Sequence, residues 1–233
     1  MERKHKHIMA IGAHIGDAEL TCGKTLAKHA KLGDKITTVA ITPGEKGCPI
    51  NLDYVEFEKM NIKGAQTFAG MLGGEFVLIG YPDGEVPDND ELRYKIADVI
   101  REKKPDIILT HWVDSLHKDH IVTAKAVKDA VFFAGQPYIT RENPPHSVGG
   151  LYFAENWEDI HEFEPYIYID VTDGYDLWEE AIQKLWLSTN SPWFKYLEYY
   201  DALSRTRGAL ISRKRAECFA VSPYNKRLVK ESF

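Results

Sequence analysis

The sequence predicts a single-domain α/β protein with a Rossmann-like fold, in which helices cover both faces of an open, mostly parallel sheet. Two observations predict this fold. Over the first two-thirds of the chain, short apolar runs typical of strands alternate with segments whose apolar residues recur at helical spacing. Such alternation favours parallel strands joined by right-handed crossovers. The length of 233 residues suits one well-buried core over residues 1–233.

Strands are predicted where runs are short and apolar or rich in β-branched residues. The clearest is Ile36–Thr42, a continuous run of the kind that is buried on both faces of a sheet. The full set is His7–Ala13, Ile36–Thr42, Glu75–Gly80, Asp106–His111, Leu151–Ala154 and Tyr166–Val171.

Helices are predicted between these strands. The clearest apolar stripe is formed by Leu92, Ile96, Val99 and Ile100, which recur at i, i+4, i+7 and i+8. The other predicted helices are Asp17–Leu32, a segment within Tyr54–Leu72, His120–Ala134, Tyr175–Leu187 and Trp193–Ala216. The segment Gly135–Gly150 is rich in Gly, Pro, Asn and Ser, which predicts a loop at the edge of a site.

Charge and composition exclude several classes of partner. The chain has 29 Lys and Arg against 35 Asp and Glu, a net charge of −6 that argues against a nucleic-acid surface. No apolar run approaches the roughly 20 residues of a membrane span, and Ile8–Ala13 is too short for the core of a signal peptide. The three cysteines are far apart and odd in number, as expected for reduced thiols. We therefore expect a cytoplasmic protein that binds neither nucleic acid nor membranes.

Two polar clusters follow predicted strands, at the ends where open α/β sheets bind ligands. Gly12–Glu19 follows the first strand, and His111–His120 follows the fourth. Histidine and carboxylate side chains suit a borderline-soft cation such as zinc, and three protein ligands leave one coordination position for water. A zinc ion of this kind activates water for attack at neutral pH. The competing interpretation is structural, because Asp17 is also well placed to cap a helix.

At these residues the sequence resembles the PIG-L/LmbE-like family of zinc-dependent de-N-acetylases. The family carries Ala-His-Pro-Asp-Asp after its first strand and His-x-Asp-His after its fourth, where this chain has Ala13–Asp17 and His117–His120. Gly44–Gly47 and Pro82–Gly84 also fit, after the second and third strands. The order and spacing of these motifs together are specific, and the similarity covers nearly the whole chain. It continues through Lys104–Asp106, Thr110–His111, Arg207–Gly208 and Ala216–Glu217.

The resemblance implies a zinc ion held by His14, Asp17 and His120. It also implies that His117, oriented by Asp119, acts at the developing tetrahedral oxyanion or donates a proton to the leaving amine. Both roles agree with the chemistry, because hydrolysis of an acetamide needs an electrophile for the carbonyl oxygen and an acid for the nitrogen. Because His and carboxylate ligands accept several divalent ions, Fe2+ is an alternative to zinc.

Two further carboxylates, Glu45 and Asp83, follow the second and third predicted strands. They are predicted to bind hydroxyl groups of a sugar-linked substrate. As exposed side chains near turns, they are equally suited to capping backbone N–H groups.

One position departs from the family motif. The first Asp of Ala-His-Pro-Asp-Asp is the family's general base, and this chain has Gly16 there. Three explanations follow. Another carboxylate takes the role of the base, or the zinc-bound water reacts unaided at a rate roughly 100- to 10,000-fold lower, or the protein binds a metal without catalysis. Glu19 is the least favoured substitute, because it points to a different face of the helix from Asp17. The candidates are Glu19, Asp114, Asp119 and Glu45.

A second departure concerns the helix before Leu72-Gly73. The family tends to place Arg and Glu there, and this chain has Asn61 and Gly64. Because the Arg is thought to help hold the substrate, the identity of the substrate stays open.

The sequence therefore predicts a zinc-dependent hydrolase that removes the acetyl group from an N-acetylated amino sugar or a similar small amide. The alternative is a non-catalytic, metal-dependent ligand-binding protein on the same fold. The aromatic-rich segment Trp193–Tyr200 is predicted to pack into the core or against a second copy of the chain in a homo-oligomer, in preference to forming a platform for a sugar.

Overall fold

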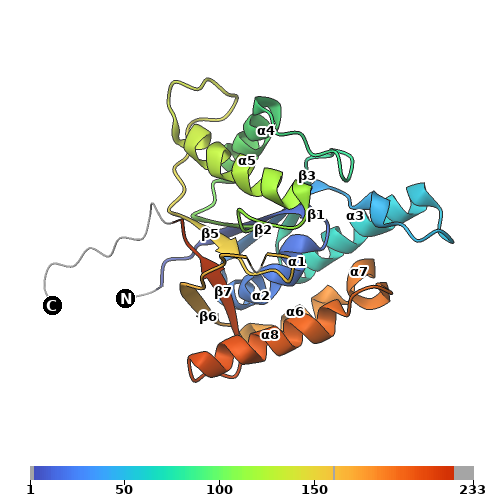
Figure 1. The fold of residues 1–233 in the computed structure, drawn as a ribbon. Helices are drawn as coiled ribbons and strands as arrows, with labels where there is room; N and C mark the ends of the chain where they lie inside the picture. Colours follow the sequence, from blue (N-terminus) through green and yellow to red (C-terminus); the bar gives the residue numbers. More distant parts are fainter. Residues whose placement is uncertain (1–2, 160, 223–233) are drawn as a thin grey trace, which may run out of the picture.

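The strands form one open sheet (Figure 1). The computed structural model describes residues 3–159 and 161–222, and its seven strands lie in the order β3-β2-β1-β4-β5-β7-β6. Neighbours among β1 to β5 are parallel, whereas β7 is antiparallel to both β5 and β6. The Rossmann-like, mostly parallel sheet is thus confirmed. The strands are β1 (His7–His14), β2 (Lys35–Thr42), β3 (Glu75–Leu78), β4 (Ile107–Thr110), β5 (Gly150–Ala154), β6 (Ile167–Asp170) and β7 (Ala216–Ala220).

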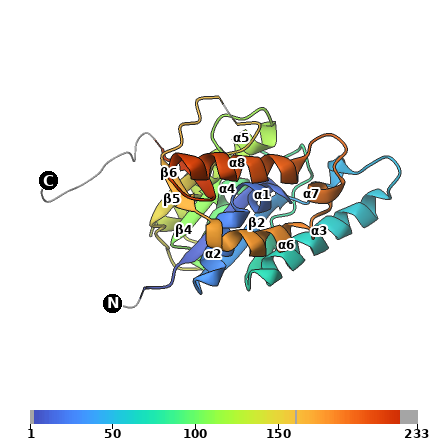
Figure 2. The ribbon, with the colours of Figure 1, turned by 90° about the horizontal axis from the view of Figure 1, so that it is seen from below.

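Helices cover both faces of the sheet, as predicted (Figures 1 and 2). Helices α4 and α5 pack on one face, and α1, α2, α3, α6 and α8 lie on the other. None of the helices in the described ranges is both long and apolar enough to cross a membrane. The helices are α1 (Asp17–Thr21), α2 (Gly23–Lys31), α3 (Tyr54–Met71), α4 (Asp90–Lys103), α5 (Lys118–Gly135), α6 (Tyr175–Ile182), α7 (Trp186–Asn190) and α8 (Tyr196–Leu210), with short 3-10 helices η1 (Glu45–Gly47) and η2 (Thr172–Gly174).

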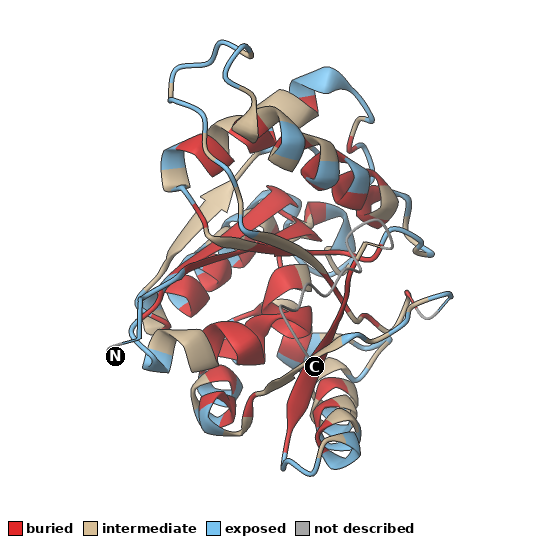
Figure 3. Ribbon diagram, turned by 90° about the vertical axis from the view of Figure 1, so that its left-hand side faces the viewer, coloured by how far each residue is buried: buried red, intermediate tan, exposed pale blue. Residues whose placement is uncertain are grey.

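The side chains of each strand alternate between the two helical layers. In β1, Ile8 and Ala10 pack with the layer that contains α1, α2, α3 and α6, whereas Met9 and Ile11 pack with α4 and α5. All four side chains are at most 1% exposed. Figure 3 shows the outcome, with buried residues in the central strands and on the inner faces of the helices. The sheet is therefore held rigidly between two cores, and its strand ends are fixed in space.

The helix predicted over Asp17–Leu32 is broken into α1 and α2. Cys22 ends the first helix and forms the N-cap of the second. The break places Gly23 against the indole of Trp178, where a Cβ would lie 2.5 Å from the ring. Close packing between α2 and α6 thus overrides the continuous helical pattern of the sequence.

The C-terminal part contains a strand that the sequence pattern conceals. The pattern predicts one helix over Trp193–Ala216, but α8 ends well before Ala216 and β7 follows. The helix predicted over Tyr175–Leu187 is likewise divided, into α6 and the start of α7. An acidic residue, Glu217, lies inside β7. Its carboxylate accepts the backbone N–H groups of Lys24 and Thr25 at the start of α2, at 3.1 and 2.8 Å. The free N–H groups of a helix terminus therefore accommodate a buried carboxylate in a strand.

The predicted loop between α5 and β5 is present, and one buried side chain holds it. Arg101 of α4 is 1% exposed. Its guanidinium closes the C-terminal end of α5, where backbone carbonyls have no partner within the helix, and fastens the loop to α4. The accepting carbonyl oxygens, at 2.8–3.3 Å, belong to Phe133, Ala134, Gln136, Ile139 and Asn143.

Replacing Arg101 with Met is expected to lower the free energy of unfolding by about 3–5 kcal/mol, because buried carbonyl groups lose their charged donor. Arg141→Met is the matched control, since that guanidinium pairs with Asp98 at the surface and its loss should cost about 1 kcal/mol or less. Urea-induced unfolding measures both values. A loss below about 1 kcal/mol for Arg101→Met would contradict this role.

Candidate metal and active site

A pocket lies beyond the carboxyl ends of the parallel strands. Its volume is about 190 Å³. Segments that follow β1, β2, β3, β4 and β5 meet there with side chains from α3, α7 and α8. This is the edge at which open α/β sheets bind ligands. The polar lining includes His14, Asp17, Thr21, Asn61, Asp83, His117, His120, Asn156 and Glu158, with the hydroxyl-bearing rings of Tyr196 and Tyr200.

The turn from β1 into α1 places His14 and Asp17 side by side. Helix α1 begins at Asp17, and Gly16 is the N-cap residue, so Asp17 is not the cap. The backbone N–H of His14 donates to Asp17 Oδ2 at 2.7 Å, which turns the carboxylate back toward the strand end. Gly12 leaves room for this arrangement, because a Cβ there would lie 2.8 Å from the Cβ of Asp17.

The segment that follows β4 and the first turn of α5 supply three histidines. His111 Nε2 accepts the backbone N–H of Ala13 at 2.9 Å, which joins the ends of the neighbouring strands β1 and β4. His117 is the N-cap residue of α5, and its Nδ1 accepts the backbone N–H of Asp119 at 3.2 Å. His120 lies in the first turn of α5 and lines the pocket. The two polar clusters of the sequence therefore meet at one edge of the sheet.

The two clusters converge on a single atom, Asp17 Oδ2. It lies 3.2 Å from His14 Nδ1, 3.2 Å from His111 Nε2 and 3.4 Å from His120 Nε2. The side chains of His14, Asp17 and His120 are 14%, 16% and 5% exposed. Because little water screens these groups, their charges interact strongly.

Two of these spacings are compatible with ligands of a zinc ion. Tetrahedral ligands at about 2.0–2.1 Å from zinc lie about 3.3 Å from one another. His14 Nδ1 and His120 Nε2 match this spacing, at 3.2 and 3.4 Å from Asp17 Oδ2. His111 does not fit as a ligand, because its Nε2 already accepts the N–H of Ala13.

Carboxylates also lie on the outer side of both histidines. His14 Nε2 is 3.0 Å from Asp83 Oδ1 and 3.4 Å from Asp119 Oδ2, and His120 Nδ1 is 3.3 Å from Glu158 Oε2. A carboxylate in this position fixes which ring nitrogen carries the proton and leaves the other free to face a metal. Among the described residues, four groups bring three possible ligand atoms close together: His14 with His117 and His120, Asp17 with His111 and His120, His14 with Asp83 and Asp119, and His120 with Glu158 and Asp159.

The cluster shifts the pKa values of its members. Burial opposes the positive charge of His14, but the charge of Asp17 and hydrogen bonds to carboxylates raise the pKa of His14 well above its usual value. Burial likewise opposes ionisation of Asp17, yet the charges of His120 and His14 hold its pKa well below the usual value. For Asp83 and Asp119, hydrogen bonds to His14 outweigh burial and lower the pKa. The carboxylates thus stabilise a proton on His14, and a bound cation would replace that proton.

His117 offers a hydrogen-bond donor to the pocket. Since its Nδ1 accepts an N–H, the neutral ring carries its proton on Nε2. Burial and then the positive charges of His14 and His120 lower its pKa. The backbone N–H of Asp119, rather than its carboxylate, holds the ring, and that carboxylate accepts the N–H of Gly84 at 2.7 Å.

The carboxylates considered as substitutes for the missing base do not line the pocket. Glu19 is 2% exposed and accepts the N–H of Gly16 at 2.9 Å, and burial raises its pKa to about 7. Asp114 pairs at 2.6 Å with the exposed ring of His161. Asp119 is fully buried. These side chains serve local structure, as does Glu45, which is described next.

Glu45 is buried and Asp83 is half-buried, in contrast to the exposure expected from their positions near turns. Glu45 is 4% exposed, and its Oε1 accepts the backbone N–H of Asp83 at 2.9 Å, so it holds the turn after β3. Asp83 lines the pocket and contacts His14. Within the described part of the chain, Asp17, Asp83 and Glu158 are the carboxylates of the lining.

The structure explains the second departure from the family pattern. Asn61 of α3 lines the pocket and donates to the backbone oxygen of Pro43 at 3.1 Å. A Cβ at Gly64 would lie 2.7 Å from the backbone oxygen of Lys184. The close approach of α3 to the turn after α6 therefore leaves no room for a side chain at position 64.

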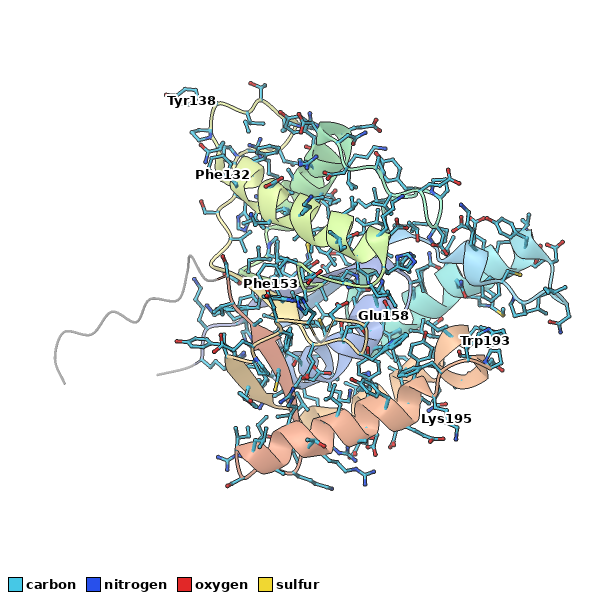
Figure 4. The ribbon with its side chains drawn as sticks, in the orientation of Figure 1. Phe132, Tyr138, Phe153, Glu158, Trp193 and Lys195 are labelled. Atoms are coloured by element: carbon cyan, nitrogen blue, oxygen red, sulfur yellow. The ribbon has the colours of Figure 1, made fainter. Side chains whose placement is uncertain are left out.

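Sequence reasoning missed the contribution of the segment after β5. Asn156, Trp157 and Glu158 line the pocket, and Figure 4 labels Glu158 on this segment. The signal was present, because these residues follow a predicted strand at the same edge of the sheet. Part of the aromatic-rich segment also lines the pocket, through Tyr196 and Tyr200.

A Rossmann-like sheet with a His/Asp cluster at the ends of β1 and β4 defines an α/β protein with a candidate metal centre in its ligand pocket. The chain belongs to the PIG-L family: the family model described as GlcNAc-PI de-N-acetylase matches residues 9–131, just over half of its length.

Relatives with known names act by more than one reaction. The chain is 25% identical over 222 residues to a 4-oxalmesaconate hydratase of Pseudomonas putida, covering 91% of this chain and 84% of that one. It is 24% identical over 188 residues to a diacetylchitobiose deacetylase of Thermococcus kodakarensis, covering 76% and 68%. The crystal structure of the conserved protein TT1542 from Thermus thermophilus superposes with a TM-score of 0.83 at 27% identity, covering 98% and 99%. Relatives of this chain are thus deacetylases and hydratases.

In the metal-free protein, His117 is expected to titrate below pH 6.5 with its neutral proton on Nε2, because burial and cationic neighbours disfavour its charged form. His161 is the control: the hydrogen bond to Asp114 and the charge of Glu162 raise its pKa, so it should titrate above pH 6.5. Nitrogen-15 NMR of the imidazole rings during a pH titration measures both. Titration of His117 at a higher pH than His161 would contradict the described environment.

Proposed function

We propose that this protein is a zinc-dependent hydrolase that removes the acetyl group from an N-acetylated amino sugar or a similar small amide. One observation carries the proposal: His14 Nδ1 and His120 Nε2 lie 3.2 and 3.4 Å from Asp17 Oδ2, in a pocket that His117 also lines. A divalent cation held by these atoms supplies a polarised water and a Lewis acid for a carbonyl oxygen. The relationship to a diacetylchitobiose deacetylase supports the choice of reaction.

The other residues of the pocket orient and exchange protons. The Nε2–H of His117 donates a hydrogen bond to the carbonyl oxygen as negative charge develops there, or His117 takes up the proton of the attacking water and delivers it to the leaving amine. The charges of Asp83 and Asp119, 3.0 and 3.4 Å from His14 Nε2, favour a proton on that nitrogen and thereby leave Nδ1 directed at Asp17.

The proton of the attacking water has no carboxylate acceptor at position 16. Asp83 and Glu158 line the pocket, but each lies on the outer side of a histidine, away from Asp17. We therefore propose that the reaction proceeds without the family's base, at a rate roughly 100- to 10,000-fold lower than with one.

The first test measures metal content and acetate release together. The purified protein is expected to hold about one zinc ion per chain. Substitution of His14, Asp17 or His120 by Ala should remove most of it. His117→Ala should retain zinc and lower acetate release from N-acetylglucosaminyl compounds about 100-fold or more. Elemental analysis also distinguishes zinc from Fe2+. Retention of zinc by all three ligand variants would contradict the proposed site.

The second test restores the missing carboxylate. Gly16 has φ +113°, which strains the backbone of any other residue, and a Cβ there would also lie 3.1 Å from Leu187 Cδ2. Leu187→Ala removes the second obstacle and leaves the backbone strain. The double variant Gly16→Asp/Leu187→Ala provides room and is expected to raise acetate release about 10-fold or more over Leu187→Ala alone. An unchanged rate in a folded, zinc-loaded double variant would show that the missing base does not limit the reaction.

A second candidate function is hydration of a carbon–carbon double bond. Two observations favour it: the carboxylate of the deacetylase motif is absent at Gly16, and the matched hydratase covers 91% of this chain. Loss of ultraviolet absorbance from a conjugated oxo-acid such as 4-oxalmesaconate tests it directly. Zinc binding with neither reaction would instead favour the non-catalytic binding protein.

The cellular setting is part of the proposal. We place the protein in the cytoplasm, with a small N-acetylated, sugar-linked molecule as its partner. Association of copies into a homo-oligomer stays a prediction from the aromatic-rich segment.

A further inference from the structure

The pocket has an aromatic wall that the proposed hydrolysis does not use. Trp157, from the segment after β5, and Tyr196, from the start of α8, both line the pocket. Trp157 stacks on Phe194 with ring centroids 4.5 Å apart and planes at 19°, and Phe194 meets Tyr196 edge-on at 4.9 Å. Because the rings pack on one another, the wall is fixed before any ligand arrives.

The carboxylate of Glu158 adjoins this wall. Glu158 follows Trp157 in the chain, lines the pocket and has a side chain that is 16% exposed. Its Oε2 is buried and lies 3.3 Å from His120 Nδ1, so this oxygen is directed at His120 and not at the pocket. A carboxylate has a second oxygen with lone pairs of its own, so Oε1 has capacity for a donor from a ligand.

We propose that Trp157, Tyr196 and Glu158 form a subsite for the ring of an uncharged, hydroxyl-bearing substrate. The aromatic wall packs on the apolar face of the ring, and Glu158 accepts a hydroxyl group. The inference rests on the proposed function, because the kinetic tests below measure acetate release. Binding of the ring can be measured without that reaction. The volume of about 190 Å³ suits one such ring, since pockets for larger ligands have about 300–1,000 Å³.

The charges of the pocket give this subsite its selectivity. Asp17, Asp83 and Glu158 contribute three carboxylates to the lining, and within the described residues the lining includes no Lys or Arg. A divalent cation leaves this set with a negative balance. A ring that carries its own carboxylate is therefore repelled, whereas an uncharged ring is not.

A matched pair of substrates tests the selectivity. Methyl N-acetylglucosaminide and its 6-carboxylate differ in one group, so the ratio of their kcat/KM values reports the charge of the pocket. We expect the wild type to favour the uncharged compound about 100-fold, and Glu158→Gln to reduce that preference about tenfold or more. Because both substrates meet the same zinc-loaded enzyme, a change in zinc content alone does not alter the ratio.

The aromatic wall is tested by variants of one tryptophan. Trp157→Leu is expected to raise KM for the uncharged compound about tenfold, and Trp157→Phe should restore most of the loss because it keeps a ring on Phe194. Trp193→Ala is the control: Trp193 is 92% exposed, precedes α8 and does not line the pocket, so KM should not change (Figure 4).

Saturation-transfer NMR with methyl N-acetylglucosaminide separates this inference from the proposed function. Binding that is lost in Trp157→Leu, without acetate release by the wild type, supports the subsite and contradicts the hydrolase. Acetate release with unchanged KM and unchanged substrate ratio in the Trp157→Leu and Glu158→Gln variants overturns the subsite and leaves the hydrolase. Absence of binding, or preference for the carboxylated ring, also overturns the subsite.

Discussion

The site depends on one carboxylate oxygen. Asp17 Oδ2 lies within 3.4 Å of three imidazole nitrogens, in a pocket where water screens charge poorly. Such a concentration of groups needs a shared proton or a bound cation, because removing charges from water is costly unless they are paired. Without a cation, a proton takes this place: the pKa of His14 is raised and the pKa of Asp17 is lowered, so His14 holds a proton beside an ionised Asp17. We attribute the cluster to a divalent cation for this reason.

The sheet topology brings the members of the cluster together. β1 and β4 are neighbours and parallel, so their carboxyl ends meet although 98 positions separate Ala13 from His111, which are hydrogen-bonded to each other. Gly12 admits Asp17 to this edge, and the backbone of α5 orients His117. The same scaffold serves deacetylases and hydratases among the relatives, and both classes add water to a substrate. Differences at position 16 and along the aromatic wall are therefore where we expect the reaction and the substrate to be decided.

Much of this arrangement could be predicted from the sequence, because its signals are local. An apolar run marks β1, a β-branched run marks β2, and apolar stripes mark α4 and α5. Parallel topology places the polar strand ends at one edge. The break at Cys22 could not be predicted in this way, because it depends on the packing of Gly23 against Trp178. Strand β7 could not be predicted either, because its buried Glu217 accepts hydrogen bonds from a helix that is distant in the sequence. The burial of Glu45 depends on a hydrogen bond to the turn after β3, which no spacing in the sequence shows.

The central claim is that His14, Asp17 and His120 share one cation. Anomalous diffraction at the zinc absorption edge, from crystals of the zinc-loaded protein, tests it most directly. The account predicts one peak within about 2.2 Å of His14 Nδ1, Asp17 Oδ2 and His120 Nε2. A peak on the outer side of either ring, between His14 Nε2 and Asp83 or beside His120 Nδ1 and Glu158, would contradict it.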